Sequence, residues 1–189
     1  MKPLRQWLSV WLEWLLLGIG LGCLGTYAYE TVEARRFQAK QAVAFARSAQ
    51  TYGPVTVQTG GLVGMLDVPR LKLSTPVIEG DDDRTLKRAV GHLPDTPLPW
   101  ESGNSALAGH RDGLFRPLKD IKVGDEIRFR TSRAEVRYRV TETRIVEPDD
   151  VSVLRPRAKN ALTLITCYPF SFVGNAPRRF IVHAEVATD

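Results

Sequence analysis

One of the two cysteines of the chain, Cys167, ends an apolar run within the stretch TLITCYPF. The other, Cys23, lies in an apolar amino-terminal stretch, and a membrane-embedded sulfur cannot reach one in a polar domain with disulfide geometry. Cys167 is therefore either a buried apolar side chain or a reactive thiol. Cysteines are often buried, so its position alone favours packing, and chemistry at this thiol requires suitable neighbours.

A reactive thiol needs a proton acceptor, because an ordinary thiol is mostly protonated at neutral pH. Of the three histidines, His110 is the best placed, since it follows the apolar run Ala106–Ala108 near an expected strand end. Cys167 follows its own apolar run in the same way, so the two side chains can meet at one rim of a β-rich domain. We interpret His92 and His183 as structural or surface residues.

Attack on an amide also builds an oxyanion, which a cysteine and a histidine cannot stabilise by themselves. Arg178 and Arg179, in the segment APRRFIVHAEV, begin the last apolar run of the chain. Consecutive strand residues face opposite sides, so only one of the two can point toward Cys167. Arg179 shares its face with Ile181 and His183, but the pattern leaves the choice between the arginines open.

Short β-rich runs between turn residues follow Gly60, which is typical of an all-β barrel or sandwich. A short helix is expected over DDDRTLKRAV, with its aspartates capping the amino end and Leu86 and Val90 facing inward. This interpretation is preferred to a calcium site, which needs more oxygen ligands. Another helical turn is expected in GLFRPLKDI, where Leu114, Phe115 and Leu118 pack inward. The expected strands are Leu62–Val68, Ser74–Glu79, Ser105–Ala108, Glu126–Arg130, Glu135–Val146, Leu162–Thr166 and Arg179–Val186.

The amino-terminal run Gln6–Tyr29 is mostly apolar and has Glu13 as its only charged residue. A membrane span needs about 20 residues, whereas the apolar core of a signal peptide has about 7–15 and a small-residue cleavage site after it. The length of the run and the lack of such a site favour an uncleaved anchor. Basic residues flank the run on both sides, so their count does not decide its orientation.

The segment after the span, TVEARRFQAKQAVAFARSAQTY, has no glycine or proline and spaces Ala42, Phe45, Ala49 and Tyr52 at helical intervals. It predicts a helical stalk that continues the helix of the span and ends at Gly53-Pro54, followed by the linker VTVQTGG. The expected organisation is a membrane anchor over residues 1–30, a helical stalk and linker over 31–59, and a folded domain over 60–189.

The charge of the chain does not indicate a nucleic-acid partner. The net charge is +5 over 189 residues, with 6 basic against 3 acidic residues up to residue 59 and 20 against 18 after it. The folded domain thus carries only a small excess of positive charge, and no basic field that would attract nucleic acid is expected.

Two blocks of the sequence resemble the sortase family. TLITCYPFSFVGNAPRRFIVHAEV is similar to that family's T-L-x-T-C signature with an arginine and an apolar strand some dozen residues later. GNSALAGHRDGLFRPLKDIKVGDEI resembles its A-G-H-R-D…F…L…G-D block. The resemblance covers about residues 60–187, and the form TCYPF…APxRFIV with AVGH upstream is most like class D sortases.

The resemblance implies a closed eight-stranded β-barrel, anchored in the cytoplasmic membrane by a single span with the barrel outside the cytoplasm. It implies Cys167 as the nucleophile and His110 as the acid and base. Arg179, which directly precedes the apolar strand RFIV, would be the ligand of the oxyanion, while Arg178 adds a second cation. No cofactor and no metal ion are expected.

The implied reaction is cleavage of an LPxT-type sorting signal after its threonine, through a thioester on Cys167. The acyl group would pass to an amine of a cell-wall precursor peptide or a pilin lysine, and loops near Glu147–Lys159 would line the substrate groove. The expected partners are proteins that carry such signals, the amine acceptor and membrane lipid. One alternative is an L,D-transpeptidase. Enzymes of that class carry their cysteine in an S-H-G-C-type segment, which LITCYPF does not resemble. Another is an anchored β-module that only binds envelope proteins.

Overall fold

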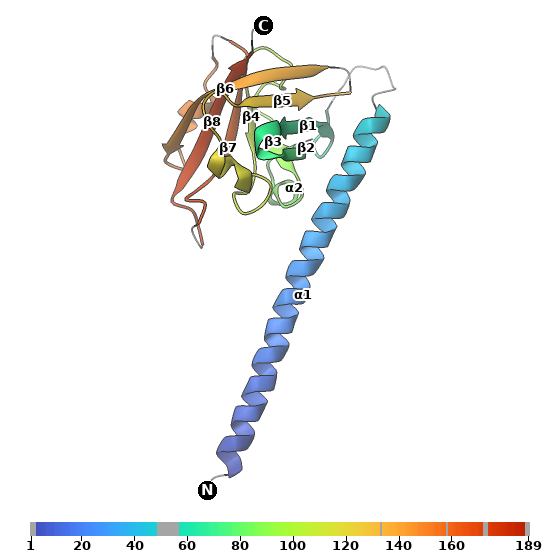
Figure 1. The fold of residues 1–189 in the computed structure, drawn as a ribbon, viewed down its shortest axis with the longest axis vertical. Helices are drawn as coiled ribbons and strands as arrows, with labels where there is room; N and C mark the ends of the chain where they lie inside the picture. The colour runs from blue at the N-terminus through green and yellow to red at the C-terminus, as the bar shows by residue number, and fades with distance from the viewer. Residues whose placement is uncertain (1–2, 49–56, 133, 158, 172–173, 188–189) are drawn as a thin grey trace. The chain divides into compact units, whose positions relative to one another are not determined.

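The computed structural model describes residues 3–48, 57–132, 134–157, 159–171 and 174–187. Its contacts divide the chain into two compact units, Met1–Phe37 and Gln38–Asp189. Where it is described, the first unit is helical throughout, and the second contains all eight strands (Figure 1).

The expected anchor and stalk form one uninterrupted helix, α1 (Pro3–Ser48). Its segment Trp11–Ala44 is long and apolar enough to cross a membrane by length and composition, with a mean hydropathy of 1.3. Apolar side chains on α1 are exposed, among them Trp14 and Leu21, as expected of a helix whose neighbour is lipid. Ala49, Tyr52 and Gly53-Pro54, where the stalk was expected to end, lie outside the described residues.

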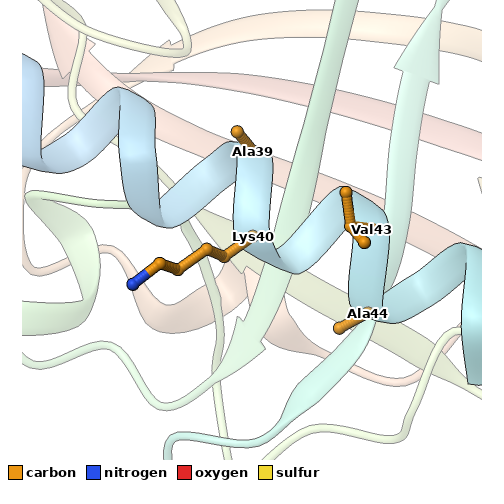
Figure 2. A pocket seen from close by; sticks show the side chains of 4 residues that line it. All are labelled: Ala39, Lys40, Val43 and Ala44. Atoms are coloured by element: carbon orange, nitrogen blue, oxygen red, sulfur yellow. The ribbon is translucent and has the colours of Figure 1, made fainter.

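Near its carboxyl end, α1 carries a shallow hollow lined by Ala39, Lys40, Val43 and Ala44 (Figure 2). Apart from the Lys40 ammonium group, its lining is made of apolar side chains and one turn of a single helix. Binding sites for small molecules combine an apolar enclosure with several converging polar groups. The hollow therefore lacks the features of a chemical site.

The strands close into a barrel in the order β1-β2-β3-β4-β7-β8-β6-β5, which confirms the predicted eight-stranded fold. Most neighbouring pairs are antiparallel, whereas β2–β3 and β4–β7 are parallel. The strands are β1 (Leu62–Val68), β2 (Leu73–Glu79), β3 (Val90–His92), β4 (Asn104–Ala108), β5 (Glu126–Arg130), β6 (Glu135–Val146), β7 (Ala161–Tyr168) and β8 (Arg178–Val186).

Three 3-10 turns and one short helix connect the strands: η1 (Pro69–Leu71), α2 (Asp83–Leu86), η2 (Arg116–Asp120) and η3 (Val151–Leu154). Asp82 caps α2 by accepting hydrogen bonds from the amides of Arg84 and Thr85, which confirms the capping interpretation. The helical turn expected after Gly113 is η2, with Phe115 and Leu118 fully buried at its base.

The expected helix over Asp81–Val90 is wrong at its carboxyl end. α2 ends at Leu86, and Val90 begins β3, a strand that the sequence pattern did not reveal. β3 has only three residues, too few for an alternating pattern, and it pairs with β2 on one side and β4 on the other. A side chain at Gly91 would meet the Gly80 carbonyl oxygen at 2.4 Å, so glycine allows this close approach of the two backbones.

Alternate residues of β7 and β8 divide between the interior of the barrel and its outer wall. Leu162, Leu164 and Val182 belong to the main core, and burying each such side chain contributes roughly 1.5–3 kcal/mol. Ile181 belongs instead to a second cluster, against which Ile165 packs. This outer cluster also contains Val153 of η3, so the connection between β6 and β7 covers part of the outer wall.

Candidate active site

Cys167 and Arg179 are direct partners in the antiparallel β7–β8 ladder. Residues that oppose each other in such a ladder extend from the same face, with their β-carbons about 4.5–5.5 Å apart. This face is the outer wall, since Ile165 and Ile181 lie on it two residues before Cys167 and two after Arg179. Both Cys167 and Arg179 are partly exposed, so the thiol and the guanidinium are open to a ligand.

The ladder resolves the choice between the two arginines that the sequence pattern left open. Arg178 pairs with Tyr168, so it extends from the opposite face of the ladder. Arg179 donates hydrogen bonds from Nη1 to the carbonyl oxygens of Ala176 and Arg178, at 3.3 and 3.2 Å. Arg179 thus lies on the side of Cys167, with its guanidinium held at the start of β8.

His110 follows β4, the parallel neighbour of β7. Ala108 pairs with Ile165, and the Gly109 amide donates a hydrogen bond of 3.1 Å to the Ile165 carbonyl oxygen. β4 ends at Ala108, and His110 lies two residues past it, as Cys167 lies two residues past Ile165, so continuing the register brings His110 level with Cys167. The imidazole is exposed, as a group that exchanges protons with a substrate must be.

Thr166 holds the backbone next to His110. Its buried hydroxyl donates a hydrogen bond of 2.7 Å to the Gly109 carbonyl oxygen. Together with the bond from the Gly109 amide, this contact fixes Gly109 to β7 through both of its backbone polar groups. This role of Thr166 is not visible in the sequence, because alternation along a strand predicts a facing direction and not a hydrogen-bond partner.

Phe115 packs under the turn that follows β4. Its ring is fully buried, and a side chain at Gly109 would approach the ring at 2.8 Å. The Phe115 amide also donates a hydrogen bond of 3.2 Å to the His110 carbonyl oxygen. The glycine before His110 is therefore required by the aromatic ring that supports the turn.

A polar network fastens the β6–β7 connection to the outer wall. The Thr163 hydroxyl donates to Asn104 Oδ1 at 2.7 Å, and the Asn104 amide donates to the carbonyl oxygens of Val153 and Arg155 at 3.0 and 3.3 Å. Because the hydroxyl proton is used in this way, His183 Nδ1, 3.0 Å from the Thr163 oxygen, is the donor of their hydrogen bond. The network orders one part of the segment Glu147–Lys159, which was expected to border the substrate groove.

His183 is 1% exposed. Its pKa is lowered from 6.5 to about 4, mainly by burial and also by the nearby cations Arg157 and Arg144, against the opposing effect of Glu142. Its ring is therefore neutral at pH 7. His183 takes part in the network that holds the β6–β7 connection, which agrees with its interpretation as a structural residue.

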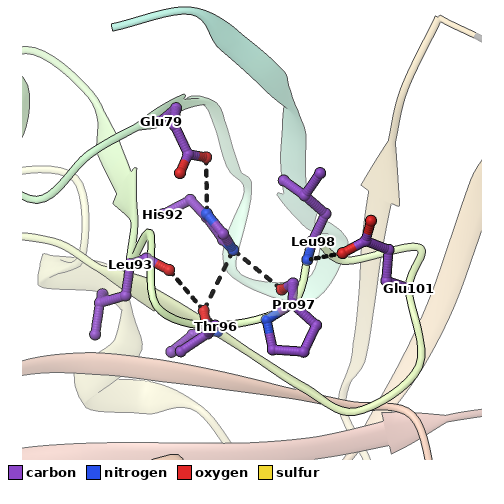
Figure 3. A network of polar contacts seen from close by, with 8 residues as sticks. Glu79, His92, Leu93, Thr96, Pro97, Leu98 and Glu101 are labelled. Atoms are coloured by element: carbon purple, nitrogen blue, oxygen red, sulfur yellow. Dashed lines mark hydrogen bonds and ion pairs between the residues drawn. The ribbon is translucent and has the colours of Figure 1, made fainter. Parts of the chain in front are cut away.

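His92 lies in a separate network on β3 (Figure 3). Its Nδ1 is 2.8 Å from a Glu79 carboxylate oxygen, and its Nε2 donates to the Pro97 carbonyl oxygen at 3.0 Å. Thr96 Oγ1 lies 3.3 Å from the same nitrogen. These contacts order the connection between β3 and β4, and they assign His92 no part at Cys167.

The site thus combines a thiol, an imidazole and a guanidinium at the carboxyl ends of two parallel strands and the start of a third. Within the described residues, no group of three or more His, Cys, Asp or Glu side chains is placed to hold a metal ion. A thiol with a proton carrier and an oxyanion donor is equipped for acyl transfer through a thioester. The site and the barrel are those of a cysteine acyl transferase.

Comparisons with known proteins agree with this class. The family profile described as Sortase domain matches residues 66–187. Sortase D of Bacillus subtilis (strain 168) is 40% identical over 132 residues, which cover 69% of this chain and 67% of that protein. The chain therefore belongs to the sortase family of cysteine transpeptidases, and its likeness to Sortase D supports the class D assignment.

Solved structures show the same fold. A Clostridium perfringens Sortase D5 transpeptidase superposes with a TM-score of 0.70 over 82% of this chain and 98% of that chain, at 23% identity. Sortase C-1 from Actinomyces oris superposes with a TM-score of 0.63 over 68% of this chain and 73% of that chain, at 30% identity. The closed barrel is therefore shared with both proteins.

Proposed function

We propose that the protein is a membrane-anchored transpeptidase that cleaves an LPxT-type sorting signal after its threonine and transfers the acyl group to an amine. Cys167 is the nucleophile, His110 the acid and base, and Arg179 the ligand of the oxyanion. The observation that carries the proposal is the strand register, which pairs Cys167 with Arg179 and brings His110 level with Cys167.

The first half-reaction forms the thioester. The thiol proton of Cys167 passes to His110, and the sulfur attacks the carbonyl carbon of the threonine. The guanidinium of Arg179 donates hydrogen bonds to the oxygen that gains negative charge. His110 then gives its proton to the leaving amine as the C–N bond breaks, and the acyl group stays on the sulfur.

The second half-reaction reverses these roles. An incoming amine attacks the thioester and loses a proton to His110, which returns the proton to the sulfur as the C–S bond breaks. Water competes for the thioester, so the amine must be positioned and the access of water restricted. The β6–β7 connection, packed on the outer wall through Val153 and Ile181, borders this face of the barrel and supports such a groove.

The family resemblance and α1 support the remaining parts of the proposal. The apolar helix holds the chain in the cytoplasmic membrane, and the barrel lies outside the cytoplasm. There it meets proteins that carry a sorting signal and an acceptor amine on a cell-wall precursor peptide or a pilin lysine.

The test is cleavage of a quenched LPxT-containing peptide by the full-length protein in detergent, with hydroxylamine as the acceptor. We expect a threonine hydroxamate in the wild-type reaction, detected by mass spectrometry. Cys167→Ala and His110→Ala should lose nearly all activity. Cys23→Ala is the matched control, because this thiol is exposed on α1, and it should retain full activity.

Two results would contradict the proposal. Cleavage that persists in Cys167→Ala would exclude the thioester, and cleavage at another bond would exclude the assigned substrate. If the wild-type protein instead acted on a cell-wall peptide through Cys167, an L,D-transpeptidase activity would replace the proposed one.

A further inference from the structure

Arg111, the residue after His110, is a buried cation. Its side chain is 6% exposed, and its guanidinium contacts backbone carbonyl groups far away in the sequence. Nη1 donates a hydrogen bond of 3.0 Å to the Pro169 carbonyl oxygen, and Nη2 donates one of 3.0 Å to the Gly174 carbonyl oxygen. One planar group therefore binds the connection between β7 and β8 at two points, the first directly after β7.

The ion pair with Asp112 does not by itself explain why the cation of Arg111 is buried. Asp112, 3.3 Å from Nε, has a side chain that is 71% exposed, so water screens the attraction. Removing a guanidinium from water costs several kcal/mol, and apolar side chains in place of buried charges often give equal or greater stability. The side chain is therefore better explained by the geometry that it imposes.

That geometry joins the three segments that carry the proposed site. Arg111 directly follows His110, Pro169 lies two residues after Cys167, and Gly174 lies five residues before Arg179. Movement of the β7–β8 connection would shift the end of β7 and the start of β8 relative to the imidazole. The hydrogen bonds from Arg111 to Pro169 and Gly174 oppose such movement.

We propose that Arg111 is a positioning residue whose guanidinium ties the β7–β8 connection to the segment of His110 and so holds Cys167 and Arg179 at the imidazole. This inference rests on the proposed function for its effect on catalysis. The effect of these hydrogen bonds on the β7–β8 connection can be tested without any substrate.

Two substitutions separate the shape of the guanidinium from its charge. Arg111→Met keeps much of the side-chain volume but removes every donor. Arg111→Lys keeps the positive charge, but its single ammonium group cannot reproduce the planar fork that reaches two carbonyl groups. Arg116→Met is the matched control, because Arg116 is an exposed arginine of η2 in the same segment.

The first measurement is steady-state cleavage of the LPxT peptide by the full-length variants in detergent, with the folded fraction determined by circular dichroism. We expect kcat of Arg111→Met to fall by about 10- to 100-fold, because small displacements of reacting groups cost that much, with KM within about threefold. The kcat of Arg111→Lys should exceed that of Arg111→Met by less than about threefold. Arg116→Met should match the wild-type protein.

The second measurement is amide hydrogen exchange. The last two β7–β8 rungs are Cys167–Arg179 and Tyr168–Arg178, and one of two successive antiparallel rungs is hydrogen-bonded. In Arg111→Met we expect exchange at these rungs to be about tenfold faster, with exchange at the interior Leu164 amide unchanged.

The two proposals fail in different ways. If Cys167→Ala is inactive while Arg111→Met keeps its kcat, or if Arg111→Lys is fully active, the positioning role is overturned and the proposed function stands. A loss that merely follows the unfolded fraction also overturns it. If the wild-type protein does not cleave the peptide, the proposed function fails. Unchanged exchange at the two rungs would overturn the positioning role of Arg111 independently of that result.

Discussion

Arg178 and Glu147 form an ion pair of 3.6 Å at the protein surface. The side chains are 56% and 68% exposed, so their attraction is screened and contributes little to stability. Its neighbour Arg179 extends from the opposite face of β8, beside Cys167. Two adjacent arginines thus have different surroundings, although the sequence presents them as a pair.

This difference gives a matched test of the oxyanion ligand. We expect Arg179→Ala to reduce kcat for peptide cleavage by about 100- to 1,000-fold, the usual effect of removing an oxyanion donor. Arg178→Ala should change kcat less than about threefold and the free energy of unfolding by less than about 1 kcal/mol. Equal losses in the two variants would show that the facing of the arginines is assigned wrongly.

Removing the hydroxyl of Thr166 should lower both stability and activity. Thr166→Val keeps the shape of the side chain but deprives the Gly109 carbonyl oxygen of its hydrogen bond. We expect a loss of about 1–3 kcal/mol in the free energy of unfolding, because a buried acceptor is left without this donor. The activity per folded molecule should fall as well, because Gly109 directly precedes His110.

The control is Thr143→Val, at an exposed threonine of β6. It should change the free energy of unfolding by less than about 0.5 kcal/mol. Chemical denaturation and peptide cleavage on the same samples measure both effects. A Thr166→Val protein with wild-type stability would show that the hydrogen bond contributes nothing.

Gly109 and Phe115 should be coupled in a double-mutant cycle. Gly109→Ala places a methyl group against the buried Phe115 ring, at a contact of 2.8 Å. Such overpacking costs about 1–3 kcal/mol. Phe115→Leu removes ring atoms at this contact, so the double variant should lose less stability than the sum of the single losses. Additive losses would mean that the ring and the added methyl group do not meet.

The sequence predicted most of the barrel because seven of its strands are long enough to alternate visibly. It did not predict β3, which has only three residues. This strand pairs with β2 and with β4, and a connecting segment separates it from each of them along the chain. It also predicted that the stalk continues the helix of the anchor, as α1 does over Pro3–Ser48.

The site shows a similar division between local and long-range information. Cys167 and His110 are candidates from the sequence because each follows an apolar run, which is a local feature. Alternation alone leaves open which of Arg178 and Arg179 faces Cys167. The register of β8 against β7, which no single strand contains, puts Arg179 on that face. The contacts of Thr166 and Arg111 reach backbone carbonyl groups more than fifty residues away, and side-chain patterning carries no information about them.

The buried histidine of the outer wall predicts how stability depends on pH. The pKa of His183 is about 4 in the folded barrel, against an ordinary value of 6.5. The unfolded chain therefore binds the proton more readily, and protonation favours unfolding. The contribution of His183 to the free energy of unfolding should be fully present above about pH 6.5. It should be lost as the pH falls toward 4, and it amounts to roughly 2–4 kcal/mol in total.

His183→Gln should remove this part of the pH dependence, because glutamine does not titrate and can still donate a hydrogen bond to Thr163. Urea unfolding of the full-length protein at pH 7 and pH 4.5 measures the effect. Trp100 fluorescence reports on the barrel once the three tryptophans of α1 are replaced by phenylalanine. Arg157→Met should weaken the dependence partly, since it removes a cation that lowers the pKa of His183. If His183→Gln loses as much stability between the two pH values as the wild-type protein, carboxylates and not this imidazole cause the decrease.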